Sequence, residues 1–481
     1  MVRPGKASGP KIIIGLLSFL AVLALGAPAL WAADASGHSI DGATLSVAWA
    51  LPFAGILLSI ALFPLFAASF WERNYGKVAI FWALAFLLPA MPVLGTSPTL
   101  YSVVHTLVDE YFPFIILLFA LFTIAGGIVL TGSLTGTPLL NLAFIATGTV
   151  LASLMGTTGA AMLLIRPLIR AIAQRKHKTH SIVFFIFLVA NAGGSLTPLG
   201  DPPLFLGFLK GVEFAWPLRH LWPQTLFLCG TLLALYFVVD LFLYRREGSP
   251  KGQGSEKLGL QGSYNFLLLA MVAGLVLYSG ISKSEGYLQV WGETRITYPG
   301  LVKDLGLLLL ALASWLITPR AVRARNHFAW GPIMEVAKLF FGIFITMIPA
   351  IAILRAGTDG ALSPLVGLVT NESGEPRNAF YFWLTGVLSS FLDNAPTYLV
   401  FFNTAGGDAQ RLMHEIPLTL AAISCGAVYM GANSYIGNAP NFIVRSIAEE
   451  RGIRMPSFFG YMLWSLVILV PLFIAMTFLF F

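Results

Sequence analysis

The sequence predicts an all-α polytopic membrane protein made of two inverted repeats, each with a re-entrant hairpin and a broken transmembrane helix. Hydrophobic residues make up 57% of the 481 residues and charged residues only 11%, which is outside the range of soluble globular domains. About ten apolar runs are long enough to cross a bilayer. Irregular segments inside the apolar sequence recur at one fixed interval, and this recurrence indicates the repeat.

The N-terminus has the layout of a secretory signal peptide. Basic residues at Arg3, Lys6 and Lys11 precede an apolar run from Ile12 to about Leu30, which small and polar residues follow. This pattern is typical of a cleaved signal, but the run is also long enough for an uncleaved first membrane helix. We expect residues 1–33 to be one or the other, with the residues that follow outside the cytoplasm.

Ten later apolar runs, flanked by charged residues, are predicted to cross the membrane. They lie near residues 48–66, 77–95, 112–131, 181–212, 223–243, 263–280, 304–318, 331–354, 417–449 and 458–480. Two further stretches, 138–173 and 379–404, contain a polar or glycine-rich break near their centres, so we expect them to be re-entrant hairpins. Lys and Arg are concentrated in the connections that this topology places in the cytoplasm, as the positive-inside rule requires.

Residues 191–203 (N-A-G-G-S-L-T-P-L-G-D-P-P) lie in strongly apolar sequence and are predicted to interrupt a membrane helix. Prolines remove backbone donors and clash with the preceding turn, and glycines weaken helix propensity. Irregular backbone persists at membrane depth only where it is buried in protein or lines a wet cavity. Asp201 is therefore a candidate functional residue, because intramembrane charges and discontinuous helices mark the binding sites of transporters. Alternatively, Asp201 could simply cap the helix that begins at Pro202.

The two halves of the chain are related by a shift of 237 positions, and a linker rich in Gly, Ser and charge, residues 245–262, separates them. The shift superposes the hairpin tips, Gly156 on Asp393, and the helix breaks, Asp201 on Asn438. An odd number of predicted crossings lies between the two breaks, so the second copy is inverted relative to the first. Inverted repeats with paired broken helices describe a secondary transporter whose site lies between the copies near the bilayer midplane.

Bringing the two tips and the two breaks together would surround one cavity with oxygen atoms, the ligands of hard cations. The candidate ion-binding or substrate-binding residues are Thr157, Thr158, Asn191, Ser195, Thr197, Asp201, Asp393, Asn394, Thr397, Asn433, Ser434 and Asn438. A cation such as sodium, lithium or potassium would be held by Asp201, Asp393 and Asn394, and competition between the cation and protons for the two carboxylates would be sufficient for antiport. Asp393 could instead be a turn residue of its hairpin tip, and the helix dipoles leave the sign of the substrate open.

Other classes of protein fit the sequence less well. The net charge of +7 comes from short basic runs between apolar segments, so nucleic acid is not an expected partner. The two cysteines have no metal-ligand spacing, and no cofactor is expected beyond transported sodium and protons. Two intramembrane aspartates also suit an intramembrane aspartyl protease, but proteolysis would leave the repeats unexplained, so we expect no enzyme. Asp240, near the predicted cytoplasmic end of a span, is expected to be solvated. The seven histidines fall in predicted loops or at span ends, with no paired spacing that would suggest a metal site.

The break motif and the tip motif S-S-F-L-D-N-A-P-T resemble those of the ion transporter superfamily, which includes NhaD-type sodium/proton antiporters, arsenite permeases and citrate or dicarboxylate carriers. The resemblance covers nearly the whole mature chain and is closest to the antiporter branch. Carboxylate carriers of this superfamily typically have Ser-Asn-Thr tips, whereas this chain has Gly-Thr-Thr and Asp-Asn-Ala. The resemblance implies a homodimer in the bacterial cytoplasmic (inner) membrane, in which scaffold helices hold a mobile transport domain.

This implied organisation assigns a role to each segment. Scaffold helices are expected over 34–131 and 263–378, and the linker over 245–262. The transport region of the first repeat is expected over 132–244 (hairpin 138–173, broken helix 181–212), and that of the second over 379–481 (hairpin 379–404, broken helix 417–449). The expected function is secondary active transport, first as a cation (sodium)/proton antiporter. A sodium-coupled citrate or dicarboxylate symporter and an arsenite efflux permease are the alternatives, so the partner is a small ion or a small anion.

Overall fold

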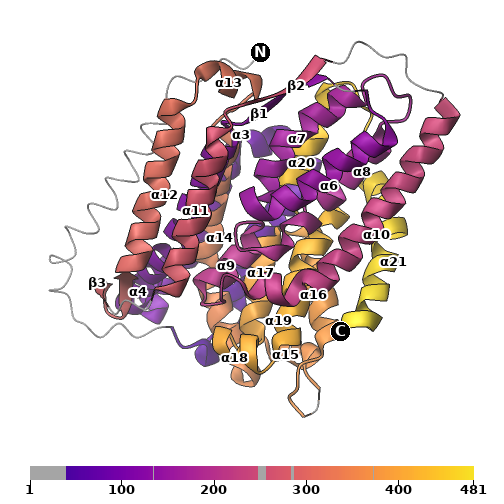
Figure 1. Ribbon diagram of the computed structural model, residues 1–481. Coiled ribbons are helices and arrows are strands. Elements are labelled where there is room, and N and C mark those ends of the chain that lie inside the picture. The colour runs from indigo at the N-terminus through magenta and orange to yellow at the C-terminus, as the bar shows by residue number, and fades with distance from the viewer. Residues whose placement is uncertain (1–39, 134, 248–255, 283–285, 372) are drawn as a thin grey trace. The chain divides into compact units, whose positions relative to one another are not determined.

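The computed structural model describes residues 40–133, 135–247, 256–282, 286–371 and 373–481 (Figure 1). Helices dominate these residues, and ten of the helical segments described are long and apolar enough to cross a membrane. The prediction of an all-α polytopic membrane protein is therefore confirmed. The expected signal peptide or first span, residues 1–33, lies outside the described residues.

The chain folds into two compact units, each built from separate stretches of sequence. The first unit takes the described residues of Met1–Ile124, Ala270–Ile317 and His327–Leu368, and the second takes Ala125–Leu269, Thr318–Asn326 and Val369–Phe481. The predicted scaffold and transport segments also alternate along the sequence, but Thr318–Asn326 of the second unit lies within the predicted scaffold segment 263–378. Their roles in transport stay predictions.

The first unit is made of membrane helices with short connections. Its elements are η1 (Gly42–Thr44), η2 (Val47–Ala50), α2 (Leu51–Phe66), α3 (Ala68–Leu94), α4 (Thr96–Thr106), the π-helical turn η3 (Leu107–Tyr111), α5 (Phe112–Ala125), α11 (Tyr264–Ile281), β3 (Tyr287–Trp291), β4 (Thr294–Thr297), α12 (Tyr298–Ile317), α14 (Gly331–Arg355), η5 (Gly357–Asp359) and α15 (Ser363–Val369). Helices α5, α11 and α15 each continue across the boundary into the second unit. Strands β3 and β4 form an antiparallel pair.

Small residues bring α3 and α14 together in the first unit. Ala83, Phe86 and Ala90 of α3 are buried with Ile345 of α14 in one hydrophobic cluster. Alanine allows two helix backbones to approach closely, and the intervening aromatic ring fills the space that remains. The segment between predicted spans 77–95 and 112–131 is helical rather than a loop. Residues 99–112 contain no glycine or proline that would interrupt a helix.

The second unit holds both hairpins and both broken helices. Its elements are β1 (Val129–Ser133), α6 (Pro138–Met155), α7 (Thr157–Ala171), α8 (Thr179–Leu188), η4 (Ala192–Leu196), α9 (Pro202–Leu209), α10 (Trp216–Glu247), β2 (Glu256–Gln261), α13 (Arg320–Arg325), α16 (Asn378–Phe391), α17 (Asn394–Thr404), α18 (Ala409–His414), α19 (Pro417–Met430), η6 (Gly431–Asn433), α20 (Ala439–Glu450) and α21 (Phe458–Phe480). The hairpins are α6–α7 and α16–α17, and the broken helices are α8–η4–α9 and α19–η6–α20. Figure 1 shows α9 of the first repeat beside α17 of the second, and the two helices are in contact.

Equivalent hydrogen bonds join the hairpin to the broken helix in each repeat. The Thr197 hydroxyl donates to the carbonyl oxygen of Ser153, and 237 positions later the Ser434 hydroxyl donates to the carbonyl oxygen of Ser390 at 2.5 Å. The Ser153 hydroxyl also donates to the Gly193 carbonyl at 2.5 Å. The Ser153 and Ser390 carbonyls lie in the last turns of α6 and α16, where a helix leaves its carbonyls without donors, and the Gly193 carbonyl lies in the break itself. The internal repeat is therefore present in three dimensions as well as in sequence.

The described residues of the predicted linker, 245–262, include the end of a helix and a strand. Its first residues complete α10, and β2 pairs antiparallel with β1, so that Val129 lies opposite Gln261. The expectation of a span over 112–131 is wrong at its end, because the Gly-Gly pair at 126–127 stops the helix and β1 begins at Val129. The partner strand is more than 100 residues away in the sequence, and no local pattern reveals such a pairing.

Candidate functional site

Asp201 lies at the centre of the second unit, at the junction of the first break and α9. Its side chain is buried and forms no capping bond to the start of α9. The Oδ1 atom instead accepts hydrogen bonds from Thr157 Oγ1 at 3.1 Å and Asn438 Nδ2 at 3.3 Å, and Oδ2 accepts one from Asn394 Nδ2 at 2.5 Å. The carboxylate is therefore directed toward both hairpin tips and the second break, and capping is not its role.

The partners of Asp201 are related by the internal repeat. Thr157 and Asn394 occupy equivalent positions at the two hairpin tips, and Asn438 occupies the position in the second break that Asp201 occupies in the first. The Thr157 amide also donates to the carbonyl of Gly200 at 2.9 Å, which fixes the first tip against the first break. The Asp201 carboxylate thus lies where the two hairpin tips and the two breaks meet. The equivalent residue in the second repeat, Asn438, is a neutral amide.

Four helices begin at this point. Helix α7 starts at Thr157, α9 at Pro202, α17 at Asn394 and α20 at Ala439. The N-terminal end of a helix carries a partial positive charge from its unpaired amides, so negative charge is stabilised there. The helix termini therefore help to hold a buried carboxylate at position 201 without a basic side chain.

Asn394 also leaves an oxygen atom free at the site. Its Nδ2 is used by Asp201, whereas its Oδ1 is buried and has no hydrogen-bond donor among the described residues. A buried acceptor without a donor is costly unless another group satisfies it. Together with Asp201 and the Thr157 hydroxyl, this oxygen could contribute to the ligands of a hard cation.

Asp393 is placed differently from Asp201. Its Oδ1 accepts a hydrogen bond from the Ala395 amide at 3.1 Å, which caps α17, and its carbonyl accepts one from the Thr397 hydroxyl at 3.0 Å. The side chain is half-buried. The structure therefore gives Asp393 the geometry of a residue that shapes the hairpin tip, which was the alternative considered from sequence. A ligand role for Asp393 stays a prediction.

Several predicted site residues fasten the breaks to their surroundings. Ser195 bonds the Thr225 hydroxyl at 2.8 Å, Asn433 donates to the Ser390 hydroxyl at 2.9 Å, and Thr197 and Ser434 make the equivalent bonds described above. Thr158 is half-buried beside Thr157 at the start of α7. These contacts indicate positioning of the unwound backbone.

An asparagine bridge joins the two broken helices. Asn191 Nδ2 donates to Asn441 Oδ1 at 2.7 Å, and Asn191 Oδ1 accepts from Asn438 at 3.2 Å. Asn441 Nδ2 donates in turn to the freed carbonyls of Gly431 and Ser434, both at 2.9 Å. Sequence reasoning missed Asn441. The available signal was that Asn441 is a polar residue in the apolar first part of α20, four positions before Arg445, the first charged residue of that helix.

Replacing Asn441 with Ala should destabilise the protein by about 2 kcal/mol or more, because two buried carbonyls lose their donor. The measurement is the thermal unfolding midpoint of the purified protein in detergent. Asn74→Ala is the matched control, since Asn74 is outside this site and its bonds are local: it donates to the Phe70 carbonyl at 2.9 Å and accepts from Lys77 at 3.2 Å. If the Asn441→Ala variant has the same thermal unfolding midpoint as Asn74→Ala, then water or a shift of the backbone replaces the hydrogen bonds of Asn441.

The paired hairpins, the paired breaks and the buried polar site between them define a secondary active transporter of the membrane. The family CitMHS_2, described as "Putative citrate transport", matches residues 42–481. The chain belongs to this family, which confirms the resemblance to the ion transporter superfamily and makes the chain a multi-pass membrane transporter rather than an enzyme. No curated protein matches the chain.

Proposed function

We propose that this protein is a cation/proton antiporter, with sodium as the cation, in which Asp201 binds the cation and the proton in turn. One observation carries the proposal. Asp201 is buried, and the partners that its carboxylate has among the described residues, Thr157, Asn394 and Asn438, are all neutral. Helix N-termini and neutral donors offset only part of the cost of a buried negative charge, and a proton or a small cation supplies the countercharge that is still lacking.

The two countercharges exclude each other at this site. A proton on Asp201 removes the negative charge that attracts a cation, and a cation bound to the carboxylate displaces the proton. With the cation present, the Thr157 hydroxyl and the free Asn394 Oδ1 complete part of an oxygen shell. Alternate occupancy of one site on the two sides of the membrane exchanges cations for protons.

Sodium-coupled transport of citrate is the second candidate, because the family description names citrate. The four helix N-termini favour an anionic substrate, but Asp201 would repel it unless sodium neutralised the carboxylate first. Sodium would then be a co-substrate and not the exchanged ion. The same residues therefore support either coupling, and the flux of protons distinguishes them.

The test uses the purified full chain in proteoliposomes with a pH-sensitive dye inside and a preset pH gradient. Sodium, lithium or potassium is added first, and citrate is then added with and without sodium. We expect sodium to dissipate the pH gradient in the absence of citrate. Citrate uptake that requires sodium, with no proton movement when sodium is added alone, would reject antiport and support the symporter.

A further inference from the structure

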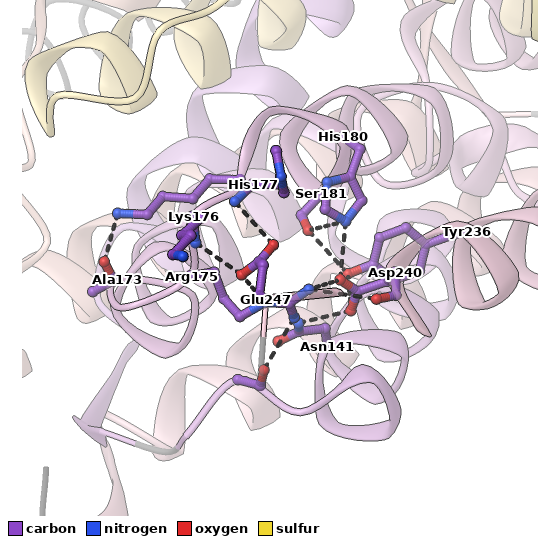
Figure 2. A network of polar contacts seen from close by, with 12 residues as sticks. Asn141, Ala173, Arg175, Lys176, His177, His180, Ser181, Tyr236, Asp240 and Glu247 are labelled. Carbon is purple, nitrogen blue, oxygen red and sulfur yellow. Dashed lines mark hydrogen bonds and ion pairs between the residues drawn. The ribbon is translucent and has the colours of Figure 1, made fainter. Parts of the chain in front are cut away.

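Asp240 is buried in α10, which contradicts the expectation that it is solvated. Its side chain is fully inaccessible, and four donors converge on the carboxylate (Figure 2). They are Arg175 Nη2 at 2.8 Å, His180 Nε2 at 2.9 Å, Asn141 Nδ2 at 3.0 Å and the Tyr236 hydroxyl at 3.4 Å. The hydropathy pattern misled here, because a charge at the end of an apolar run is usually solvated.

A second carboxylate extends the network. Glu247, at the last turn of α10, accepts hydrogen bonds from Arg175 Nε at 3.1 Å and from the backbone amides of Lys176 at 2.8 Å and His177 at 3.0 Å. We name Arg175, His180, Asp240 and Glu247 the clasp. Through Asn141 and these four residues, α10 is tied to the outer limb of the first hairpin, to the α7–α8 connection and to α8 (Figure 2).

The clasp connects directly to the elements that build the site. The α6–α7 hairpin carries Thr157 at its tip, and α8 leads into the break that carries Asp201. Movement of either element relative to α10 would separate Asp240 from at least one of its donors. The hydrogen bonds and ion pairs of the clasp therefore affect how tightly the first hairpin tip and the first break are held against α10.

The charges of the clasp balance only when His180 carries a proton. Arg175 supplies one positive charge and Asp240 and Glu247 supply two negative charges, and the four side chains are at most 5% exposed. An uncompensated charge in such a place is costly. Glu247 also lies at the C-terminal end of α10, where the helix dipole disfavours negative charge. Imidazole is the side chain that changes charge at ordinary pH.

The charged groups around the clasp have partners or solvent of their own. Lys176 is exposed, as are Arg245 and Arg246 in the last turn of α10, and Lys178 donates to the Ala173 carbonyl at 2.5 Å. On α20, which also packs against α8, Arg445 and Glu449 pair with each other at 2.9 Å.

Aromatic rings and neutral groups complete the surroundings of the clasp. Tyr236 stacks on the His180 ring with centroids 5.9 Å apart, the Tyr244 ring lies 5.0 Å from the Arg175 guanidinium, and Ser181 bonds the Tyr236 hydroxyl at 3.1 Å. His180 is thus the group in the clasp that can adjust the balance of charge.

We propose that the clasp is a pH-sensitive joint: a proton on His180 tightens α10 against the first hairpin and α8, and loss of that proton loosens them. The proposal goes beyond the transported ion and holds for a symporter as well as for an antiporter. The basic connections around the clasp are those that the charge distribution predicts to face the cytoplasm, so the joint would respond to cytoplasmic pH.

The test is hydrogen–deuterium exchange of the purified full chain in nanodiscs, followed at the amides of Lys176 and His177, which donate to Glu247. After correction for intrinsic rates, we expect roughly fivefold slower exchange at about pH 6 than at about pH 8, because a protonated His180 adds an ionic attraction to the hydrogen bond that the Asp240 carboxylate already accepts from it. His180→Gln keeps an Nε2–H donor for Asp240 but cannot take up a proton, so its exchange should stay at the high-pH level. His177→Gln is the control, because the His177 side chain is exposed, and it should behave as the wild type does.

A second variant tests the charge balance directly. Glu247→Gln removes the excess negative charge, so the remaining clasp is balanced with a neutral His180, and exchange in the α7–α8 connection should no longer depend on pH. Thermal unfolding verifies that each variant is folded. A pH dependence that persists in both His180→Gln and Glu247→Gln, or that is absent from the wild type, would overturn the proposal. Because transport is not measured, this result is independent of whether sodium or citrate is carried.

Discussion

Replacement of Asp201 by Asn should abolish coupled transport and leave the protein folded. Asn has nearly the same shape. Its oxygen can accept from Thr157 and Asn438, and its amide nitrogen can donate to Asn394 once that side chain turns its free Oδ1 toward position 201. It cannot, however, carry the charge that binds a cation or a proton. Loss of one charged partner at a buried ionic site reduces binding by about 100-fold or more. The measurement is sodium-driven proton flux in proteoliposomes, with thermal unfolding as the check on folding.

Two further variants decide whether the effect belongs to the carboxylate. Asp393→Asn keeps the oxygen that accepts from the Ala395 amide, so it should retain most of the flux if Asp393 only shapes the tip. Combining Asp201→Asn with Asn438→Asp moves the charge to the equivalent position in the other repeat, where the two side chains are 3.3 Å apart, and should restore part of the flux. Full flux in Asp201→Asn alone would remove Asp201 from the mechanism.

The broad architecture could be predicted from the sequence because membrane helices are encoded by local composition. Long apolar runs give the spans, and the glycines and prolines around Asp201 interrupt a helix for reasons that act within a few residues. The repeat was detectable because both irregular features recur at one offset. Thr157, Asn394 and Asn438 could be named as candidates for the same reason, and the structure brings all three to Asp201.

The remaining features depend on contacts between distant parts of the chain. Asp240 could not be assigned from its neighbours in the sequence, since three of its four donors come from α6, the α7–α8 connection and α8. Asn441 was missed because the two carbonyls that accept its hydrogen bonds are freed only by the second break. Asp201 and Asp393 looked alike as intramembrane carboxylates, and only the structure shows that one faces the convergence of four segments while the other caps a helix.

Gly200→Ala adds a single methyl group near the site, and we expect it to reduce both stability and transport. A Cβ at position 200 would overlap the carbonyl oxygen of Gly194, which is backbone and cannot rotate away. The two glycines let the first break fold back on itself, and Asp201 is the next residue. Overpacking at such a place should cost about 3 kcal/mol, seen as a lower thermal unfolding midpoint, and the displaced carboxylate should lose transport in protein that remains folded.

Two controls separate this close approach from the general effect of adding a methyl group. Gly230→Ala in α10 meets no atom within 4 Å, so it should be neutral or stabilise the helix by about 0.5–1 kcal/mol. Gly437→Ala repeats the change in the second break, where a Cβ would lie 2.6 Å from the carbonyl oxygen of Gly431. Because the repeat places the two breaks in equivalent surroundings, Gly437→Ala should resemble Gly200→Ala and not Gly230→Ala. A Gly200 variant with unchanged unfolding and transport would show that the break relaxes, and that the carboxylate does not depend on this contact for its position.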